Sequence, residues 1–314
     1  MSASGNSINY DLRTAKSVER RMISSVVKEL FSKVNHNKRR YIGMGSTYFT
    51  DFKLFHKELH IKNMISIEIE QRLQKRVEFN KPFSCINVEI GKSTDVLPQL
   101  NWNKNVDLIW MDYDEKLNYD YFTDIEIIFT NMAKGGVYLM TCNKQLHRYQ
   151  TVADFEEEFG GLVPLGTHVT DFNGENDFKL IRKMLLNKIN EVVQSRNYSL
   201  EENEQLIFRQ LFYFTYRDGA PMISYGGYLD LKNNAFNLKD YTLDRFDFIS
   251  TEEIRYVISP PVITNREINL LNSCLPNSEK KYNSFGKIQF IPESDRESFR
   301  KLYKFLPTYM DVMY

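Results

Sequence analysis

Glycine, acidic and amide residues stand at the ends of four apolar runs, where they could contact a ligand. These segments are Gly43-Met44-Gly45 after the first run, Glu68 after the second, Asp112-Tyr113-Asp114 after the third and Asn143 after the fourth. The carboxyl ends of parallel strands meet along one crevice, which is where open α/β sheets bind ligands. The order of these segments therefore predicts one binding site assembled from four parts of the chain.

The glycine segment and Glu68 form the first half of this predicted site. A glycine turn lets the backbone approach a ligand closely, because no Cβ stands in the way. Glu68 follows Gly45 by about 23 residues. This is close to the roughly 20 residues that separate such a turn from a carboxylate that binds both ribose hydroxyls. The alternatives are a strand-to-helix turn without a ligand and, for Glu68, a carboxylate stabilised by a helix N-terminus.

The Asp112-Tyr113-Asp114 segment is the predicted reacting edge. Carboxylates at this place can orient an amine, accept a proton or hold a divalent ion. Asp112 is the first candidate for a catalytic role and Asp114 the second, with Tyr113 as a candidate substrate contact. The alternative is a solvated acidic turn. Asn143, after the next run, is expected either to line the acceptor side or to cap a loop.

A basic helix is expected before the first strand. From about Asp11 to Val34, apolar residues recur at helical spacing, and positions between them are basic, among them Arg13, Lys16 and Arg20. Two interpretations stay open for these three residues. They are candidates for binding phosphate, from a nucleic acid or a nucleotide, or they belong to a solvated helix face.

The bulk composition excludes several classes of protein. Lys+Arg and Asp+Glu are each 41 in 314 residues, so the net charge is zero, which argues against non-specific polyanion binding by the whole surface. Three cysteines without CxxC spacing and five histidines without a metal signature predict neither disulfides nor a metal site. No apolar stretch is long enough for a membrane span or a signal peptide. We therefore expect a soluble, cytoplasmic protein without a membrane partner.

Strands and helices are predicted to alternate over the first half of the chain. The expected strands are 39–43, 63–68, 84–90, 106–111 and 136–142, and the expected helices are 47–59, 70–79, 95–100 and 121–132. Alternation of this kind implies a parallel sheet with helices on both faces and right-handed crossovers. The strands read as continuous apolar runs, as strands covered on both faces should.

Later segments predict a different organisation. Residues 150–210 have a helical pattern, and two β-rich runs, 211–216 and 222–229, surround Asp218-Gly219, which is a hairpin signal. Thr264 and Glu267 then form a capping box at the start of a helix. We expect a basic helix at 1–35, an α/β domain at 36–230 with a helical insertion at about 150–210, and a C-terminal extension at 231–314.

Five βα units closed by an antiparallel hairpin resemble the class I S-adenosylmethionine-dependent methyltransferase superfamily, over about residues 36–230. The resemblance implies a Rossmann-like, seven-stranded, mostly parallel sheet. It implies S-adenosylmethionine as the cofactor, bound by Gly43, Gly45, Glu68, Ser93 and Asp112. Thr47 stands where the family has a third glycine, and Lys92 stands where an acidic residue near the adenine is commonest. Ser93 or a backbone amide would then contact the adenine.

Three functional hypotheses follow, and we favour the first. It is an S-adenosylmethionine-dependent methyltransferase acting on a nucleic acid or a nucleotide-like acceptor. The second is a catalytically inactive, methyltransferase-like binding or sensor module, with the C-terminal extension as a surface for a protein partner. The third is a metal-dependent enzyme with Asp112 and Asp114 as ligands, either an O-methyltransferase or a sugar-nucleotide transferase with a D-x-D motif.

Overall fold

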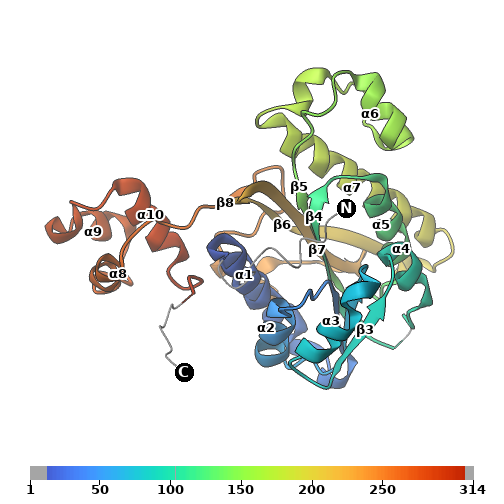
Figure 1. Cartoon of the computed structure of the whole chain (residues 1–314), viewed down its shortest axis with the longest axis horizontal. Helices are drawn as coiled ribbons and strands as arrows, with labels where there is room; N and C mark the ends of the chain where they lie inside the picture. Colours follow the sequence, from blue (N-terminus) through green and yellow to red (C-terminus); the bar gives the residue numbers. More distant parts are fainter. Residues whose placement is uncertain (1–12, 103, 308–314) are drawn as a thin grey trace.

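One eight-stranded sheet organises the computed structural model, which describes residues 13–102 and 104–307 (Figure 1). The strand order is β3-β2-β1-β4-β5-β7-β6-β8. The strands are β1 Arg39–Gly43, β2 Met64–Glu68, β3 Ile86–Ile90, β4 Val106–Lys116, β5 Val137–Asn143, β6 Leu206–Asp218, β7 Ala220–Leu231 and β8 Tyr256–Ile258. Strands β1 to β5 are parallel, and β7 runs antiparallel to β5 and β6. This confirms the predicted Rossmann-like α/β fold with an antiparallel hairpin.

The expected number of seven strands is one too few. The eighth, β8, pairs in parallel with Phe214–Tyr216 of β6 at the sheet edge. It has three residues and lies just before Pro260-Pro261, so its sequence carries no alternation long enough to predict a strand. The sheet therefore includes part of the segment that we expected as a C-terminal extension; the domain boundaries themselves stay a prediction.

Helices cover both faces of the sheet. One face carries α1 Thr14–Leu30, α2 Thr50–Leu59 and α3 Gln74–Asn80, and the other carries α4 Ser93–Val96, α5 Tyr119–Asn131 and α7 Asn176–Asn197. The alternation of side chains along each strand divides the core. Tyr41 packs with the α1 and α2 side chains, whereas Ile42 packs with those of α5 and α7.

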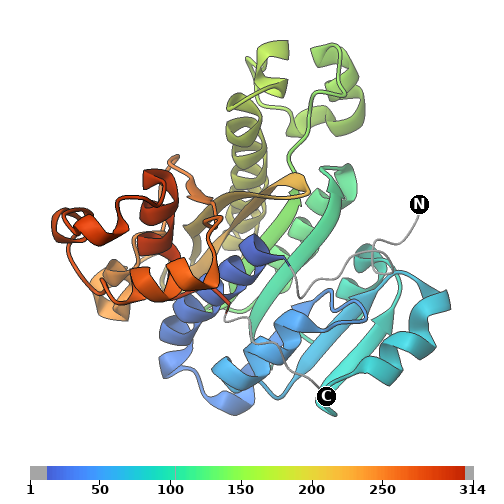
Figure 2. The same cartoon turned by 60° about the vertical axis from the view of Figure 1, so that its left-hand side comes forward.

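Several predicted helices are shorter than expected. The helix expected at 47–59 starts only at Thr50, because Ser46 and Phe49 adopt left-handed backbone angles that no helix can include. The pattern at 150–210 resolves into α6 Val152–Phe159 and α7, and β6 already begins at Leu206. Figure 2 shows α7 running along the sheet and projecting beyond it with α6.

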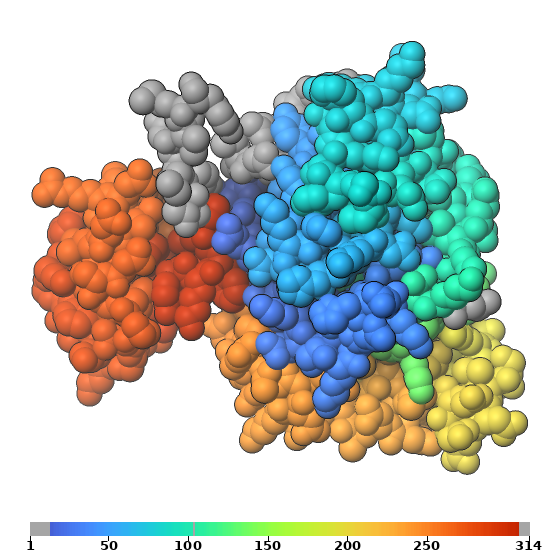
Figure 3. All heavy atoms as spheres, turned by 90° about the horizontal axis from the view of Figure 1, so that it is seen from below, coloured from blue at the N-terminus to red at the C-terminus, as the bar shows by residue number. Residues whose placement is uncertain are grey.

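The last part of the chain forms a helical lobe beside the sheet (Figure 1), and Figure 3 shows its atoms as a mass set beside the rest of the molecule. Its helices are α8 Asn265–Asn272, α9 Glu279–Asn283 and α10 Glu293–Leu302. The predicted capping box at the start of α8 is confirmed, since Thr264 and Glu267 exchange hydrogen bonds. A small core of its own holds the lobe, around Leu271, Tyr282 and Phe299. Within the described residues, every helix is too short or too polar to cross a lipid bilayer.

Candidate active site

The glycine turn after β1 is closely packed. A Cβ at Gly43 would lie 2.2 Å from the phenol oxygen of Tyr41, and one at Gly45 would lie 2.6 Å from Ser66 Oγ and 2.7 Å from the Phe49 ring. Each position therefore requires glycine for packing within the protein itself. The same packing presents bare backbone at the carboxyl end of the sheet.

Glu68 lies beside this turn, as predicted. The Gly45 N–H donates to Ser66 Oγ at 3.1 Å, and the Ser66 hydroxyl donates to Glu68 Oε1 at 2.9 Å. Burial raises the pKa of the Glu68 carboxyl, while the Ser66 hydrogen bond and the backbone of Ser46 and Gly45 oppose this rise. The structure therefore brings the first two predicted segments together through a serine that the sequence analysis did not single out.

The next side chain, Ile69, is 67% exposed although it is apolar. It follows Glu68 directly at the end of β2, so it presents an apolar surface next to a carboxylate. Sequence reasoning missed it, because an apolar residue directly after an apolar strand gives no sign that its side chain is exposed.

Ser93 begins α4 on the opposite face of the sheet from α1. Its hydroxyl donates to Asp124 Oδ2 at 2.5 Å, and the Tyr113 hydroxyl donates to the same oxygen at 2.5 Å. Burial raises the pKa of Asp124 to about 6. Asp124 was not predicted as part of the site; its place on α5 within an apolar pattern gave a helix signal only.

Tyr113 faces away from Asp112, since neighbouring residues of a strand point to opposite faces. Its ring is buried and stacks on Tyr121 with centroids 3.6 Å apart, and its hydroxyl is bound to Asp124. This placement corrects the expectation that Tyr113 contacts a substrate. The segment is also no turn: β4 continues through it to Lys116, with an irregular register to β5 after Asp112.

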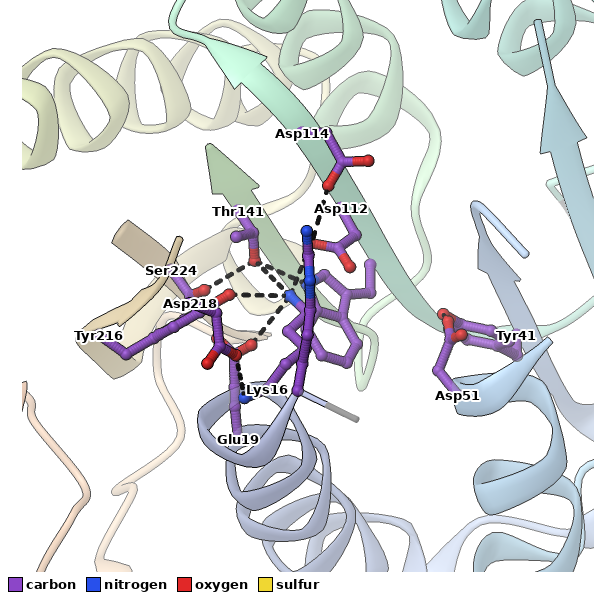
Figure 4. Close-up of polar contacts among 12 residues, drawn as sticks. Lys16, Glu19, Tyr41, Asp51, Asp112, Asp114, Thr141, Tyr216, Asp218 and Ser224 are labelled. Atoms are coloured by element: carbon purple, nitrogen blue, oxygen red, sulfur yellow. Dashed lines mark hydrogen bonds and ion pairs between the residues drawn. The ribbon is translucent and has the colours of Figure 1, made fainter. Parts of the chain in front are cut away.

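Asp112 is bound by Lys16 at the centre of a buried polar network (Figure 4). Lys16 Nζ lies 2.6 Å from Asp112 Oδ1, 2.9 Å from Glu19 Oε2 and 3.1 Å from the Tyr216 hydroxyl. It also lies 4.3 Å from the centroid of the Trp110 ring. Lys16 is 2% exposed, whereas the Asp112 side chain keeps 17% of its surface open. The network thus leaves the carboxylate accessible and encloses the ammonium group.

Sheet register places Asp112 next to the glycine turn. Trp110 of β4 is the register partner of Gly43 in β1, so Asp112 stands two residues beyond it on the same face. Asp112 is itself the partner of Thr141 in β5. The predicted reacting edge and the predicted glycine turn are therefore neighbours.

The N-terminal helix does not present the basic face that we expected. Lys16 and Arg20 are buried, because α1 lies on the sheet with its charged positions turned toward β4 and β6. Burial corrects the solvated-face interpretation for these two residues, and phosphate binding by them stays an untested prediction. Arg13 is partly exposed and lies 3.8 Å from Asp114, so this pair is the outer neighbour of the Lys16–Asp112 pair.

A second polar group lies between α1 and α2. The Tyr41 hydroxyl donates to Asp51, and both side chains are buried. Burial raises the pKa of Asp51 and the Arg20 charge opposes this rise. Burial likewise raises the pKa of Glu19, opposed by Lys16.

Asn143 ends β5, and its side-chain oxygen accepts a hydrogen bond from the Gln145 N–H at 3.0 Å. This contact matches the loop-capping alternative. Among the described residues, no group of three or more His, Cys, Asp or Glu side chains could hold a metal ion. Asp112 and Asp114, the ligands of the metal hypothesis, are paired with Lys16 and Arg13.

Comparison with known proteins gives one match over nearly the whole chain. The model of a family described as "Putative O-methyltransferase" matches residues 8–314. Searching the curated proteins gave no match.

Several solved structures are similar to this chain at low identity. Spermidine synthase from Thermotoga maritima is 14% identical with a TM-score of 0.39, over 85% of this chain and 74% of that one. The N-methyltransferase NodS from Bradyrhizobium japonicum is 14% identical with a TM-score of 0.36, over 68% and 97%. A protein from Corynebacterium glutamicum is 12% identical with a TM-score of 0.37, over 73% and 96%.

Proposed function

Because the chain belongs to the family described as "Putative O-methyltransferase", we propose that it transfers a methyl group from S-adenosylmethionine to an acceptor hydroxyl. The observation that carries this proposal is the contact of Lys16 with Asp112 beside the glycine turn. A carboxylate paired with a cation beside the turn would be suited to take the proton of an acceptor oxygen.

The residues around the turn fit the cofactor. The Glu68 carboxylate, fixed by Ser66, would accept hydrogen bonds from the ribose hydroxyls. The bare backbone of Gly43 and Gly45 would let the rest of the cofactor approach. Ile69 would cover one face of the adenine ring, with Ser93 at its edge.

Methyl transfer itself needs few protein groups. The cofactor, when bound, supplies an electrophilic methyl group on a sulfonium, which an acceptor oxygen takes as its proton leaves and S-adenosylhomocysteine is released. Asp112 would accept that proton through the carboxylate that Lys16 orients. The buried Lys16 ammonium would stabilise negative charge that develops on the oxygen, in surroundings largely closed to water.

A transfer assay with labelled methyl donor tests the proposal. The acceptor panel should contain single-stranded RNA, nucleotides and small phenols, and the variants are Asp112→Asn and Asp120→Asn. Asp120 is an exposed carboxylate on α5 and serves as the matched control. We expect transfer to at least one acceptor to fall about a hundredfold or more in Asp112→Asn only. Equal activity of Asp112→Asn and wild type would overturn the assignment of Asp112.

The proposal also concerns the chemical class of the methyl acceptor. A nucleic acid or a nucleotide is retained as the first candidate, now supported by the exposed Arg21 and Lys28 of α1 and not by Lys16 or Arg20. Transfer to RNA that weakens steeply with salt would support it. Transfer restricted to small phenols would show that the acceptor is a small phenol and not a nucleic acid or nucleotide.

A non-catalytic module that binds the cofactor and a protein partner is the second candidate. One observation favours it: Val262 and Phe290 of the C-terminal lobe are 90% and 71% exposed, as in a surface that a partner covers. Cofactor binding without transfer to any member of the panel would support this candidate. Detectable transfer would exclude it.

A further inference from the structure

We propose that Arg20 and Asp51 form a subsite for the amino-acid end of the cofactor. The Arg20 guanidinium would bind the carboxylate of the methionine moiety, and the Asp51 carboxylate would bind its ammonium group. This inference rests on the proposed function and assigns to it two residues on helices outside the glycine turn.

Arg20 is a buried cation that the protein leaves unsatisfied. Its side chain is 4% exposed, and Nε and Nη1 have no hydrogen-bond partner among the residues that the structure describes. A buried guanidinium is costly unless an anion pairs with it, and its planar fork matches the two oxygens of a carboxylate. The buried, unpaired guanidinium is therefore available to pair with an anion.

The acidic neighbour of Arg20 is not its ion-pair partner. The Arg20 charge opposes the rise in pKa that burial imposes on Asp51, yet no ion pair within 4.0 Å joins the two across residues 13–102 and 104–307. Asp51 accepts its hydrogen bond from the Tyr41 hydroxyl. The two opposite charges thus lie near each other without neutralising each other by contact.

Tyr41 lies between Asp51 and the glycine turn. Its phenol oxygen, which donates to Asp51, is the atom that a Cβ at Gly43 would meet at 2.2 Å. Asp51 is therefore one side chain away from the backbone over which the cofactor would lie. Figure 4 shows Tyr41 and Asp51 on the α2 side of the site, apart from the group that Lys16 and Asp112 form.

The arrangement matches a zwitterion. A methionine moiety carries one carboxylate and one ammonium group on the same carbon, at the end of a short chain from the sulfonium. Glu68 stands beside the turn on β2, Asp112 beside it on β4, and Arg20 and Asp51 beside it on the helical layer of α1 and α2. Ribose, sulfonium and amino-acid end would each meet a different group of the chain.

A purely structural role for Arg20 makes a different prediction. If its charge only balances the buried acids, replacing it would weaken every ligand alike by loosening α1. If it binds the carboxylate, replacing it would weaken only ligands that carry one. The test must therefore compare ligands, and it needs no turnover.

Isothermal titration calorimetry with three ligands separates these roles. S-adenosylmethionine carries both groups, its decarboxylated form keeps only the ammonium group, and 5′-methylthioadenosine lacks both. We expect Arg20→Gln to weaken S-adenosylmethionine about tenfold or more and the other two less than about twofold. Asp51→Asn should weaken the first two ligands and spare the third. Arg266→Gln, which removes an exposed arginine on α8, is the matched control.

The wild-type protein alone also decides the question if a variant does not fold. Preference of the wild type for S-adenosylmethionine over its decarboxylated form by about tenfold supports the subsite. Equal affinity for the two, or equal weakening of all three ligands by Arg20→Gln, overturns the subsite and leaves the proposed function standing. Binding of none of the three overturns both.

Discussion

Replacing Lys16 by methionine tests the buried network that surrounds the proposed reacting carboxylate. The change keeps an unbranched side chain one atom shorter and removes the charge that lies 2.6 Å from Asp112 and 2.9 Å from Glu19. Breaking a buried pair by removing one partner costs about 3–5 kcal/mol, since the other charge stays behind. Two carboxylates stay behind in this case, so we expect a loss of unfolding free energy in that range.

The loss should depend on pH. Burial raises the pKa of Glu19, and Lys16 opposes the rise, so Glu19 has a still higher pKa in Lys16→Met. A carboxyl group with a raised pKa gives its full stability below the unfolded value and loses it as pH rises through the folded value. The destabilisation by Lys16→Met should therefore be larger at about pH 8 than at about pH 5.

Urea denaturation followed by circular dichroism at both pH values measures the effect. Adding Glu19→Gln to Lys16→Met should recover part of the loss, because one of the two unpaired carboxylates is then neutral. A loss below about 1 kcal/mol, equal at both pH values and unchanged by Glu19→Gln, would refute the reasoning.

Three further predictions concern the turn, the α5 side and the metal hypothesis. Gly43→Ala should lose about 1–3 kcal/mol of unfolding free energy in chemical denaturation, because the added Cβ would lie 2.2 Å from the Tyr41 phenol oxygen. In a background with Tyr41→Leu the same substitution should cost less, and additive losses in the double variant would contradict this contact. Asp124→Asn should gain about 2 kcal/mol of unfolding free energy relative to the wild type as pH rises from about 4 to 7, measured by urea denaturation, because burial raises the pKa of Asp124 to about 6 and the wild type loses stability as pH rises through that value; a pH-independent difference would count against it. EDTA should leave labelled-methyl transfer unchanged, since Asp112 and Asp114 are paired with Lys16 and Arg13; inactivation that Mg²⁺ reverses would restore the metal hypothesis.

The order of the sheet could be predicted because its strands are apolar runs with chemistry at their ends. Four of the five parallel strands lie within two residues of their expected bounds, with β1 matching at Arg39–Gly43, whereas β4 continues five residues past its expected end. The glycine turn and Glu68 also meet as expected, since both are set by strand ends within one βαβ unit. β8 escaped prediction because three residues carry no period.

The parts of the site that come from distant segments could not be predicted. Lys16 on a helix with polar positions looks like a solvated charge, and nothing local shows that its partner is Asp112, 96 residues away along the chain. Tyr113 was assigned to the wrong face because β4 was expected to end before it, whereas the strand continues and alternates.

The central claim is that the turn and Glu68 bind S-adenosylmethionine, and calorimetry of that one ligand tests it most directly. We predict micromolar binding by the wild type and at least about tenfold weaker binding by Glu68→Ala, because the ribose hydroxyls lose a partly buried carboxylate acceptor. Glu58→Ala, which removes an exposed carboxylate on α2, should bind like the wild type. No detectable binding by the wild type, or equal binding by Glu68→Ala, would contradict the account.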